Sequence, residues 1–386
     1  MVKVIGVDAK FVLDSRKEKT ISVSVKTNVG EFSASAPSGK STGKHEVKPY
    51  KKNLSGDIET IKKFSEYFSE ESLDKFDDLK RVEDIVEGHV GGNTIIALEY
   101  AILKAMAHEQ KKEIWQLINT NLKKLPRLVG NCVGGGKHSE LVKKPDFQEF
   151  LLIPNLKSVK ENFEKNKTIK KEIERILERT DKKFEKKKNE ENAWITSLNE
   201  KEILDILSKF KIPIGLDVAA SSFFKRKKYD YKNPMLKRDS EEQFGYLCNL
   251  IKNFNLFYIE DPFGEEDFES FAKLLKKFPE RLIVGDDLTV TSHKRLDKAI
   301  KMKSISGIIV KPNQCGSLLE VKKVCELAKE KKIKIIFSHR SGETDESILA
   351  DLAFGFGADF FKCGIDGRER ESKIKRLIEI EKSLKM

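Results

Sequence analysis

Short apolar runs, each ending in polar residues, recur through the C-terminal two-thirds of the chain. They are LVGNCVGGGKH, FQEFLLIP, IPIGLDV, LFYIEDP, RLIVGDD, SGIIVK, IKIIFSHR and DFFKCG. Apolar runs of this length and composition predict eight buried strands. The last five end at polar residues spaced roughly 25 positions apart, and helical patterns fill the gaps, one of them with Ser317 as a predicted N-cap. This repeat predicts a parallel (β/α)8 barrel of the TIM type, within the α/β class.

The N-terminal third has a different pattern of apolar and polar positions. Residues 1–35 alternate apolar and polar positions, which predicts antiparallel strands. Residues 55–120 read as helical, and NTIIALEYAILKAMAHEQ is apolar enough to be an internal helix. We therefore expect a smaller α+β domain over 1–125 and the barrel over 126–386.

The composition indicates a protein with a sizeable core and gives no sign of a membrane span or a disulfide framework. With 386 residues, of which 39% are hydrophobic, the chain can form a sizeable core. No stretch approaches the ~20 apolar residues of a membrane span, and no leader pattern is seen, so we expect a soluble, cytoplasmic protein without membrane contact. The five cysteines form no CxxC pair, which argues against a disulfide framework or a zinc site.

The formal net charge of +12 raises the question of a nucleic-acid partner. The most basic stretch is 156–190, yet Ile169, Ile173, Ile176 and Leu177 lie there at helical spacing. An amphipathic helix with a solvated basic face explains this pattern, and no RNA-binding signature accompanies it. Nucleic acid is therefore the less favoured partner.

Three carboxylates end three of the predicted strands: Asp217, Glu260 and Asp286. The carboxyl ends of barrel strands meet at one rim, so these groups should converge. Hard oxygen ligands on neighbouring rigid elements suit Mg²⁺. Helix capping or pairing with lysine would explain any one of them, but three at matched exits favour a metal.

Cationic groups end the following strands. Lys311 and Lys362 close apolar strands, and a lysine crowded by a metal and a second lysine should have a lowered pKa, as a general base requires. Arg340 and Ser341 form a candidate anion clamp. Together with His138 and His339, these groups predict a small, multiply anionic substrate.

A general acid should come from the carboxylates elsewhere on the rim. Glu149 closes DFQEFLLIP, and Glu190 and Glu191 lie in the polar stretch KKKNEENAW. Either source could protonate a leaving hydroxyl.

These motifs, taken in order, resemble those of the enolase family over nearly the whole chain. The resemblance rests on LDSRKEKTISVSVKTNVGEFSASAPSGKSTGKHE, NCVGGGKH, FQEFLLIP, GLDVAASSFF, YIEDPF, VGDDLTVT, VKPNQCGSL and SHRSGETDE. It implies a phosphopyruvate hydratase that interconverts 2-phosphoglycerate and phosphoenolpyruvate plus water, and that forms a homodimer.

The resemblance also implies residue roles. Asp217, Glu260 and Asp286 would hold one Mg²⁺, and Ser41 would ligate a second. Lys311 would remove the C2 proton, Lys362 would stabilise the resulting charge, and Glu190, assisted by Glu149, would help the C3 hydroxyl to leave. The remaining implied substrate-binding residues are His138, Gln148, His339, Arg340 and Ser341.

The sequence departs from the family pattern at the acid loop. Where the family has Asp-Glu-Gly-Gly, this chain has Asn189-Glu190-Glu191-Asn192. Ungapped alignment favours Glu190 as the acid and leaves Glu191 pointing to solvent. Two alternatives stay open: a relative acting on another α-hydroxy acid, and a catalytically weakened paralogue that binds a partner such as RNA.

Overall fold

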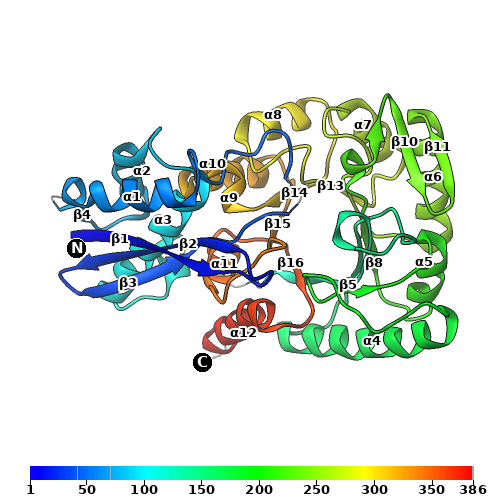
Figure 1. The fold of residues 1–386 in the computed structure, drawn as a ribbon, viewed down its shortest axis with the longest axis horizontal. Coiled ribbons are helices and arrows are strands. Elements are labelled where there is room, and N and C mark those ends of the chain that lie inside the picture. Colours follow the sequence, from blue (N-terminus) through cyan, green and yellow to red (C-terminus); the bar gives the residue numbers. More distant parts are fainter. Residues whose placement is uncertain (41, 70, 123, 385–386) are drawn as a thin grey trace.

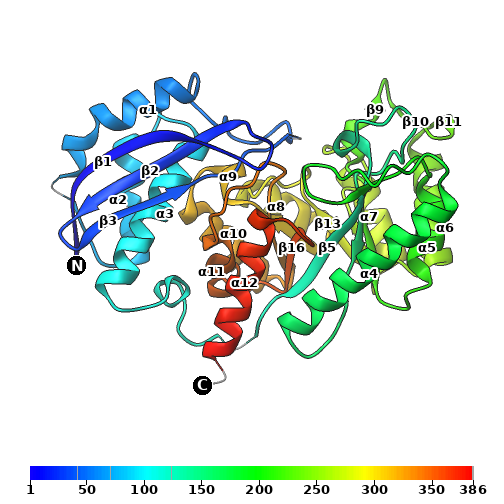
Figure 2. The same cartoon turned by 60° about the horizontal axis from the view of Figure 1, so that its bottom comes forward.

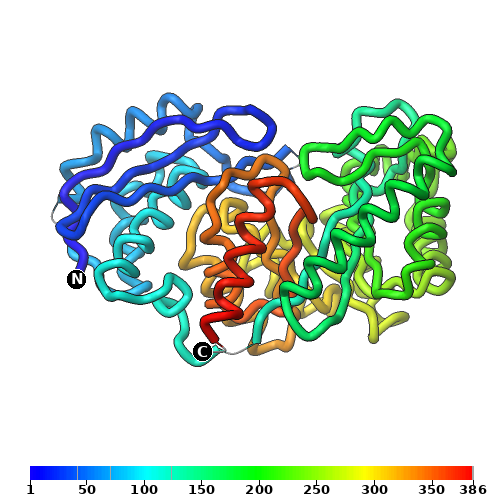
Figure 3. The backbone as a smooth tube through the Cα atoms, turned by 90° about the horizontal axis from the view of Figure 1, so that it is seen from below, coloured from blue at the N-terminus to red at the C-terminus, as the bar shows by residue number. Residues whose placement is uncertain are grey.

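The computed structural model describes residues 1–40, 42–69, 71–122 and 124–384. An N-terminal sheet with its helices lies beside a larger barrel (Figure 1). Figure 3 shows this sheet and the α4–α6 side of the barrel at opposite ends of the molecule, with α12 between them. Among the described residues, no helix is both long and apolar enough to cross a membrane.

The N-terminal sheet is antiparallel, as the alternating pattern predicts. Its strands, in the spatial order β3-β2-β1-β4, are β3 (Gly30–Ser35), β2 (Lys19–Thr27), β1 (Val2–Leu13) and β4 (Ser72–Leu73). The sheet packs against α3 (Gly92–Glu109), most of whose residues are buried, so the predicted internal helix is confirmed. Also in this part are α1 (Leu54–Lys63), α2 (Leu79–Val86), and the short helices η1 (Ser65–Phe68), η2 (Phe76–Asp78) and η3 (Ile114–Leu117).

The eight predicted strands form a closed barrel. They are β5 (Arg127–Gly134), β6 (Glu149–Leu152), β8 (Ile214–Asp217), β12 (Tyr258–Glu260), β13 (Leu282–Gly285), β14 (Gly307–Val310), β15 (Lys334–Ser338) and β16 (Phe360–Gly364). Pairing of β16 with β5 closes the ring. Every residue of β6, β8, β12, β13, β14 and β16 is buried, which explains their continuous apolar runs.

One barrel strand runs against the prediction of an all-parallel barrel. Strand β6 pairs antiparallel with both β5 and β8. The connection from β5 to β6 contains only the three-residue helix η4 (Gly136–His138), so it lacks the α-helix that usually forms a parallel crossover. This hairpin carries His138 and Glu149 to the same rim as the ends of the parallel strands.

Helices surround the barrel and follow most of its strands: α4 (Val159–Thr180), α5 (Glu200–Ser208), α6 (Ser240–Phe254), α7 (Phe268–Lys277), α8 (His293–Lys301), α9 (Pro312–Cys315), α10 (Leu318–Glu330), α11 (Ile348–Gly355) and α12 (Arg368–Ser383). The basic stretch forms α4, which buries Ile169, Ile173 and Leu177 and packs against α12 (Figure 2). Ser317 caps α10 by accepting from the Glu320 amide, as predicted.

Smaller elements complete the C-terminal part. Strand β7 (Trp194–Ile195) pairs with β5. After β8, the chain forms the short helix η5 (Ala220–Ser222) and a separate antiparallel sheet of β9 (Phe224–Lys225), β10 (Lys228–Lys232) and β11 (Met235–Arg238).

Candidate active site

The three predicted metal-binding carboxylates lie together at the carboxyl ends of adjacent strands. Asp217 and Glu260 are the last residues of β8 and β12, and the parallel register pairs them directly. Asp286 follows β13, the next strand of the barrel. All three are buried. The three strand ends therefore meet at one rim, where the carboxylates within 4.8 Å of one another are Asp261, Asp286 and Asp287.

Two lysines neutralise part of this negative charge. Lys362, on β16, donates from Nζ to Asp217 Oδ2 at 2.9 Å and to Glu260 Oε1 at 2.8 Å. Lys311 follows β14 and donates to Asp286 Oδ2. Burial and the Asp217 charge nevertheless raise the pKa of Glu260 to about 8. The cluster thus holds more carboxylate than its two lysines can keep ionised at neutral pH.

The pKa of Lys311 differs from the expectation. Burial by itself lowers this pKa, but the Asp286 carboxylate reverses the effect and the pKa is raised. The sequence predicted a lowered pKa for Lys311 beside a bound cation, and without that cation the Asp286 carboxylate decides the direction of the shift. If Asp286 held a cation, that positive charge would offset the Asp286 carboxylate and so oppose the rise in the pKa of Lys311.

Asp261 is a buried carboxylate that the sequence analysis missed. Its two oxygens accept from the backbone amides of Asp286, at 3.0 Å, and Asp287, at 2.7 Å. It therefore positions Asp286 through the backbone. The only sequence signal is its place after Glu260 in YIEDP.

The predicted anion clamp faces the N-terminal part of the chain. Arg340 donates from Nη1 and Nη2 to Oε2 of Glu46, both at 2.9 Å, and from Nη1 to Asn313 Oδ1 at 3.1 Å. The hydroxyl of Ser341 accepts from the Lys40 amide at 2.7 Å. Glu46, which the sequence analysis did not single out, therefore occupies the guanidinium of Arg340 in this structure.

The acid loop requires a correction. Glu191, not Glu190, is buried in the site: Glu191 Oε1 lies 3.6 Å from His138 Nδ1, and Glu191 Oε2 lies 3.5 Å from His339 Nε2. Glu191 Oε2 also accepts from Asn131 Nδ2 at 2.9 Å. Glu190 instead lies beside Lys40, with 3.2 Å between Oε1 and Nζ. The expectation that Glu191 points to solvent is wrong.

The local backbone explains this placement. Asn189 Oδ1 accepts from the amides of Glu191, at 3.0 Å, and Ala193, at 2.9 Å, which closes a tight turn. Asn192 completes the turn with a φ of 62°, a conformation that asparagine tolerates better than most residues. A Cβ at Gly364 would lie 2.6 Å from the Glu191 carbonyl oxygen, so glycine lets β16 approach this turn. The turn does not need the family's two glycines to present a carboxylate.

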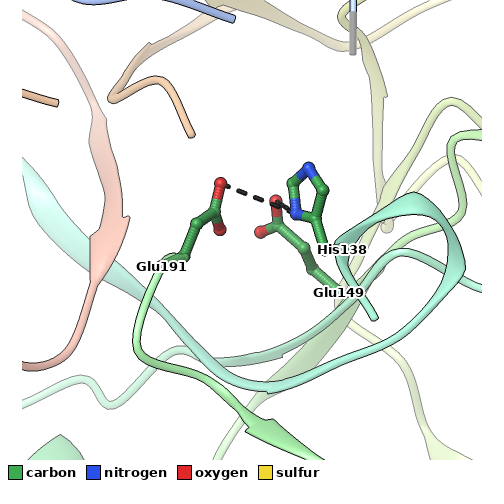
Figure 4. Close-up of side chains that lie close together, drawn as sticks. All are labelled: His138, Glu149 and Glu191. Carbon is green, nitrogen blue, oxygen red and sulfur yellow. Dashed lines mark ion pairs between the residues drawn. The ribbon is translucent and has the colours of Figure 1, made fainter. Parts of the chain in front are cut away.

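Glu149 and Glu191 form a coupled pair. Glu149 is the first residue of β6, and its Oε1 lies 3.9 Å from Nδ1 of His138 (Figure 4). Burial, and then the Glu191 charge, raise the pKa of Glu149 well above its usual value. Burial also opposes ionisation of Glu191, but His339 and His138 outweigh it and lower that pKa. These opposite shifts favour a proton on Glu149 over one on Glu191.

One cavity connects these groups. It is lined by His138, Gln148, Glu149, Glu191, Asp217, Asp261, Asp286, Lys311, His339, Arg340, Ser341 and Lys362, among others. Glu260 does not line the cavity, but it accepts a hydrogen bond from Lys362, which does. Glu190 does not line the cavity either, and Ser41 lies outside the described residues. Its volume is about 30 Å³, room for roughly one water. A larger ligand would have to displace Glu46 and its neighbours from Arg340.

This arrangement defines a class of protein: a barrel enzyme whose rim sets lysines and buried carboxylates around a site for a small anion. A model described as "Enolase, N-terminal domain" matches residues 4–118, and one described as "Enolase, C-terminal TIM barrel domain" matches residues 122–386. The chain belongs to the enolase family.

Proteins named enolase from archaea are similar over nearly the full length. The enolase of Pyrobaculum aerophilum is 37% identical over 94% of this chain and 91% of its own length. That of Methanothermobacter thermautotrophicus is 33% identical, over 98% and 96%. That of Methanocorpusculum labreanum is 34% identical, over 99% of both chains.

Proposed function

We propose that this chain is a phosphopyruvate hydratase, which interconverts 2-phosphoglycerate and phosphoenolpyruvate plus water. The observation that carries the proposal is that a candidate base and a candidate acid lie in one cavity. Lys311, a candidate base, and the Glu149–Glu191 pair, a candidate acid, both line it, together with Arg340 and Ser341. Removal of a proton and departure of a hydroxide need such an acid and base near one substrate.

The carboxylates Asp217, Glu260 and Asp286 fit a divalent cation. They offer only oxygen donors, they are buried, and burial and the Asp217 charge raise the pKa of Glu260, an effect that a bound cation would oppose. We propose Mg²⁺ as that cation. When bound, it would supply positive charge that stabilises the negative charge developing on the substrate carboxylate.

The protein's own groups would divide the remaining work. Lys311 Nζ would take the proton from C2, for which it must first be freed from Asp286. Lys362 Nζ would face the charge that develops on the substrate. The Glu149–Glu191 pair would donate its proton to the C3 hydroxyl as it leaves, and Glu191 replaces Glu190 in this role. His138, Gln148 and His339 would contact the substrate.

Arg340 and Ser341 would bind the phosphate group. Arg340 already holds a carboxylate, that of Glu46, with two donors. A substrate phosphate would take over these donors, because guanidinium and phosphate match in charge and geometry. We propose that Glu46 marks the position of the phosphate in the substrate-free protein.

Two alternatives raised by the sequence gain no support. The weakened-paralogue hypothesis rested on the altered acid loop, yet Glu191 supplies a buried carboxylate from that loop. The hypothesis of a non-phosphorylated α-hydroxy acid leaves Arg340 and Ser341 without a function. The basic stretch is explained by the packing of α4.

Turnover of 2-phosphoglycerate, followed by the ultraviolet absorbance of phosphoenolpyruvate, tests the proposal. We expect formation of product with Mg²⁺ and its loss in excess chelator. Absence of turnover by correctly folded, Mg²⁺-loaded protein would overturn it.

We also propose a homodimer and a cytoplasmic location. Phe11 and Leu13, on β1, have exposed fractions of 51% and 58%, which makes this strand a candidate for the subunit contact. Light scattering during gel filtration would measure the assembly, and Phe11→Lys should weaken it.

A further inference from the structure

One lysine of the basic stretch, residues 156–190, is buried. The whole of this stretch lies in the described part of the chain, and among its lysines and arginines only Lys170 is buried. Lys170 lies on α4, and 4% of its side chain is exposed. A solvated basic face therefore accounts for the other cationic residues of the stretch but not for this one.

The ammonium group of Lys170 reaches the turn that carries Glu191, which is formed by residues 189–193. Its Nζ donates to the backbone carbonyl of Asn192, the residue after Glu191, and to Oδ1 of Asp366. Figure 4 shows the side chain of Glu191 directed from this turn toward the other two side chains drawn there. A single cationic group thus holds the backbone directly beside the candidate acid.

Asp366 connects the Lys170 ammonium to the base of the same turn. Asp366 lies in the connection between β16 and α12, and its Oδ2 accepts from Lys188 Nζ at 3.0 Å. Lys188 precedes the turn and pairs with Trp194, which follows it, in an antiparallel bridge. Lys170 and Asp366 therefore contact both the closing residues of the turn and its base.

The same connection also packs against the side chain of Asn192. A Cβ at Gly367 would lie 2.1 Å from Asn192 Nδ2, so only glycine allows this close approach. Asn192 has a left-handed backbone, with a φ of 62°. A residue other than glycine keeps such a conformation where surrounding contacts hold it, and here the contacts come from α4 and from the connection after β16.

Stability alone does not account for a lysine at this position. Burial lowers the pKa of Lys170, and the charge of Asp366 opposes this shift only in part. Desolvation of an ammonium group costs free energy, and a buried ion pair can often be replaced by hydrophobic side chains without loss of stability. What a hydrophobic side chain cannot do is bind a backbone carbonyl in a fixed direction.

We propose that Lys170 is a positioning residue for Glu191. Its ammonium group, anchored by Asp366, holds the Asn192 carbonyl and so keeps the turn oriented with Glu191 in the cavity and Glu190 outside it. Lys170 lines no part of the cavity and would not touch the substrate. Its effect on catalysis rests on the proposed function, in which Glu191 helps the C3 hydroxyl to leave, whereas its effect on the turn does not.

Amide hydrogen exchange, followed by mass spectrometry of the full-length protein, tests the effect on the turn. Lys170→Met keeps the length of the side chain, and Asp366 retains Lys188 as a partner, so we expect the fold to be preserved. Peptides covering residues 189–193 should exchange roughly tenfold faster in Lys170→Met than in the wild type. Lys171→Met, at an exposed position of the same helix, is the matched control and should exchange as the wild type does.

Asp366→Asn provides a second variant, for which the fold does not depend on a change in α4. The substitution preserves the shape of the side chain and weakens the anchor of the Lys170 ammonium. We expect the 189–193 peptides to exchange roughly 2–5-fold faster than in the wild type. This variant decides the question if Lys170→Met does not fold.

Kinetics test the effect on catalysis. In Lys170→Met, formation of phosphoenolpyruvate should fall roughly tenfold, while C2 hydrogen exchange stays within about twofold of the wild type, because Lys311 removes the C2 proton without the acid. A general loss of structure would lower both rates together. Lys171→Met should change neither.

The outcomes separate this inference from the proposed function. Unchanged hydrogen exchange of the 189–193 peptides in folded Lys170→Met and Asp366→Asn, or a parallel loss of product formation and C2 exchange, would overturn the positioning role. Absence of turnover in the wild type, together with faster exchange of these peptides in Lys170→Met, would contradict the proposed function and leave the role of Lys170 in the turn supported.

Discussion

The two sides of the cavity handle charge in opposite ways. On the lysine side, Lys362 and Lys311 hold the carboxylates of Asp217, Glu260 and Asp286 through direct hydrogen bonds. On the imidazole side, the atoms of His138, Glu149, Glu191 and His339 face one another at 3.5–3.9 Å without such bonds. A site that contains both carboxylates and lysines is suited to binding a cation together with an anionic substrate. Carboxyl groups whose pKa values are shifted in opposite directions suit the transfer of a proton.

Removal of divalent cations should cause the largest loss of turnover, because it affects the lysine side of the cavity directly. Without a cation, Lys311 stays bound to Asp286, and the negative charge that develops on the substrate is not stabilised. Turnover should fall roughly 10³-fold or more in excess chelator and return with Mg²⁺, as followed by phosphoenolpyruvate absorbance. Full activity in excess chelator would contradict the metal assignment.

Lys311→Ala should remove the base from the same side. We expect turnover to fall roughly 10²–10⁴-fold, and exchange of the C2 hydrogen with solvent, followed by NMR, to disappear. Lys301→Ala, on the exposed side of α8, is the control and should leave both unchanged. Persistent exchange in Lys311→Ala would assign the base to another residue.

Glu191→Gln should affect only the imidazole side. Product formation should fall roughly 10²–10³-fold, while C2 exchange stays measurable, because abstraction of the C2 proton does not need the acid. Glu190→Gln is the matched control, since its carboxylate lies beside Lys40, and should change turnover by no more than a few-fold. The reverse pattern would restore Glu190 as the acid.

The pH dependence of Mg²⁺ affinity sharpens the comparison. The pKa of Glu260 is raised to about 8, so below pH 8 this carboxyl keeps a proton that the metal must displace. Affinity should therefore rise toward pH 8, by up to about tenfold per unit, and level off above it. Calorimetric titration at several pH values measures this. Constant affinity between pH 6 and 8 would contradict the raised pKa.

Glu46→Gln should have the smallest effect. The substitution removes the charge that competes with the substrate phosphate for Arg340. We expect the KM for 2-phosphoglycerate to fall roughly 2–5-fold with a smaller change in kcat. An increase in KM would show that Glu46 helps to bind the substrate instead.

The sequence predicts the lysine side well because that side depends on strand ends. Asp217, Glu260, Lys311 and Lys362 each end or follow an apolar run, and parallel strands in a barrel bring their carboxyl ends to one rim. No knowledge of side-chain packing is needed for this step. The eight strands and the buried helix α3 follow from apolar patterns in the same way.

The imidazole side depends on features that residue patterns do not carry. Strand β6 runs antiparallel to β5 and β8 after a connection that contains no crossover helix, and this brings Glu149 to Asp217. The choice between Glu190 and Glu191 depends on a turn closed by Asn189 and on the close approach of Gly364. Neighbouring residues in a turn point in different directions, so a shift of one position exchanges a carboxylate that lines the cavity for one that lies beside Lys40. Sequence alone determined the barrel and the rim at which its carboxylates and lysines meet, whereas only tertiary contacts decided which glutamate enters the cavity and which carboxylate holds Arg340.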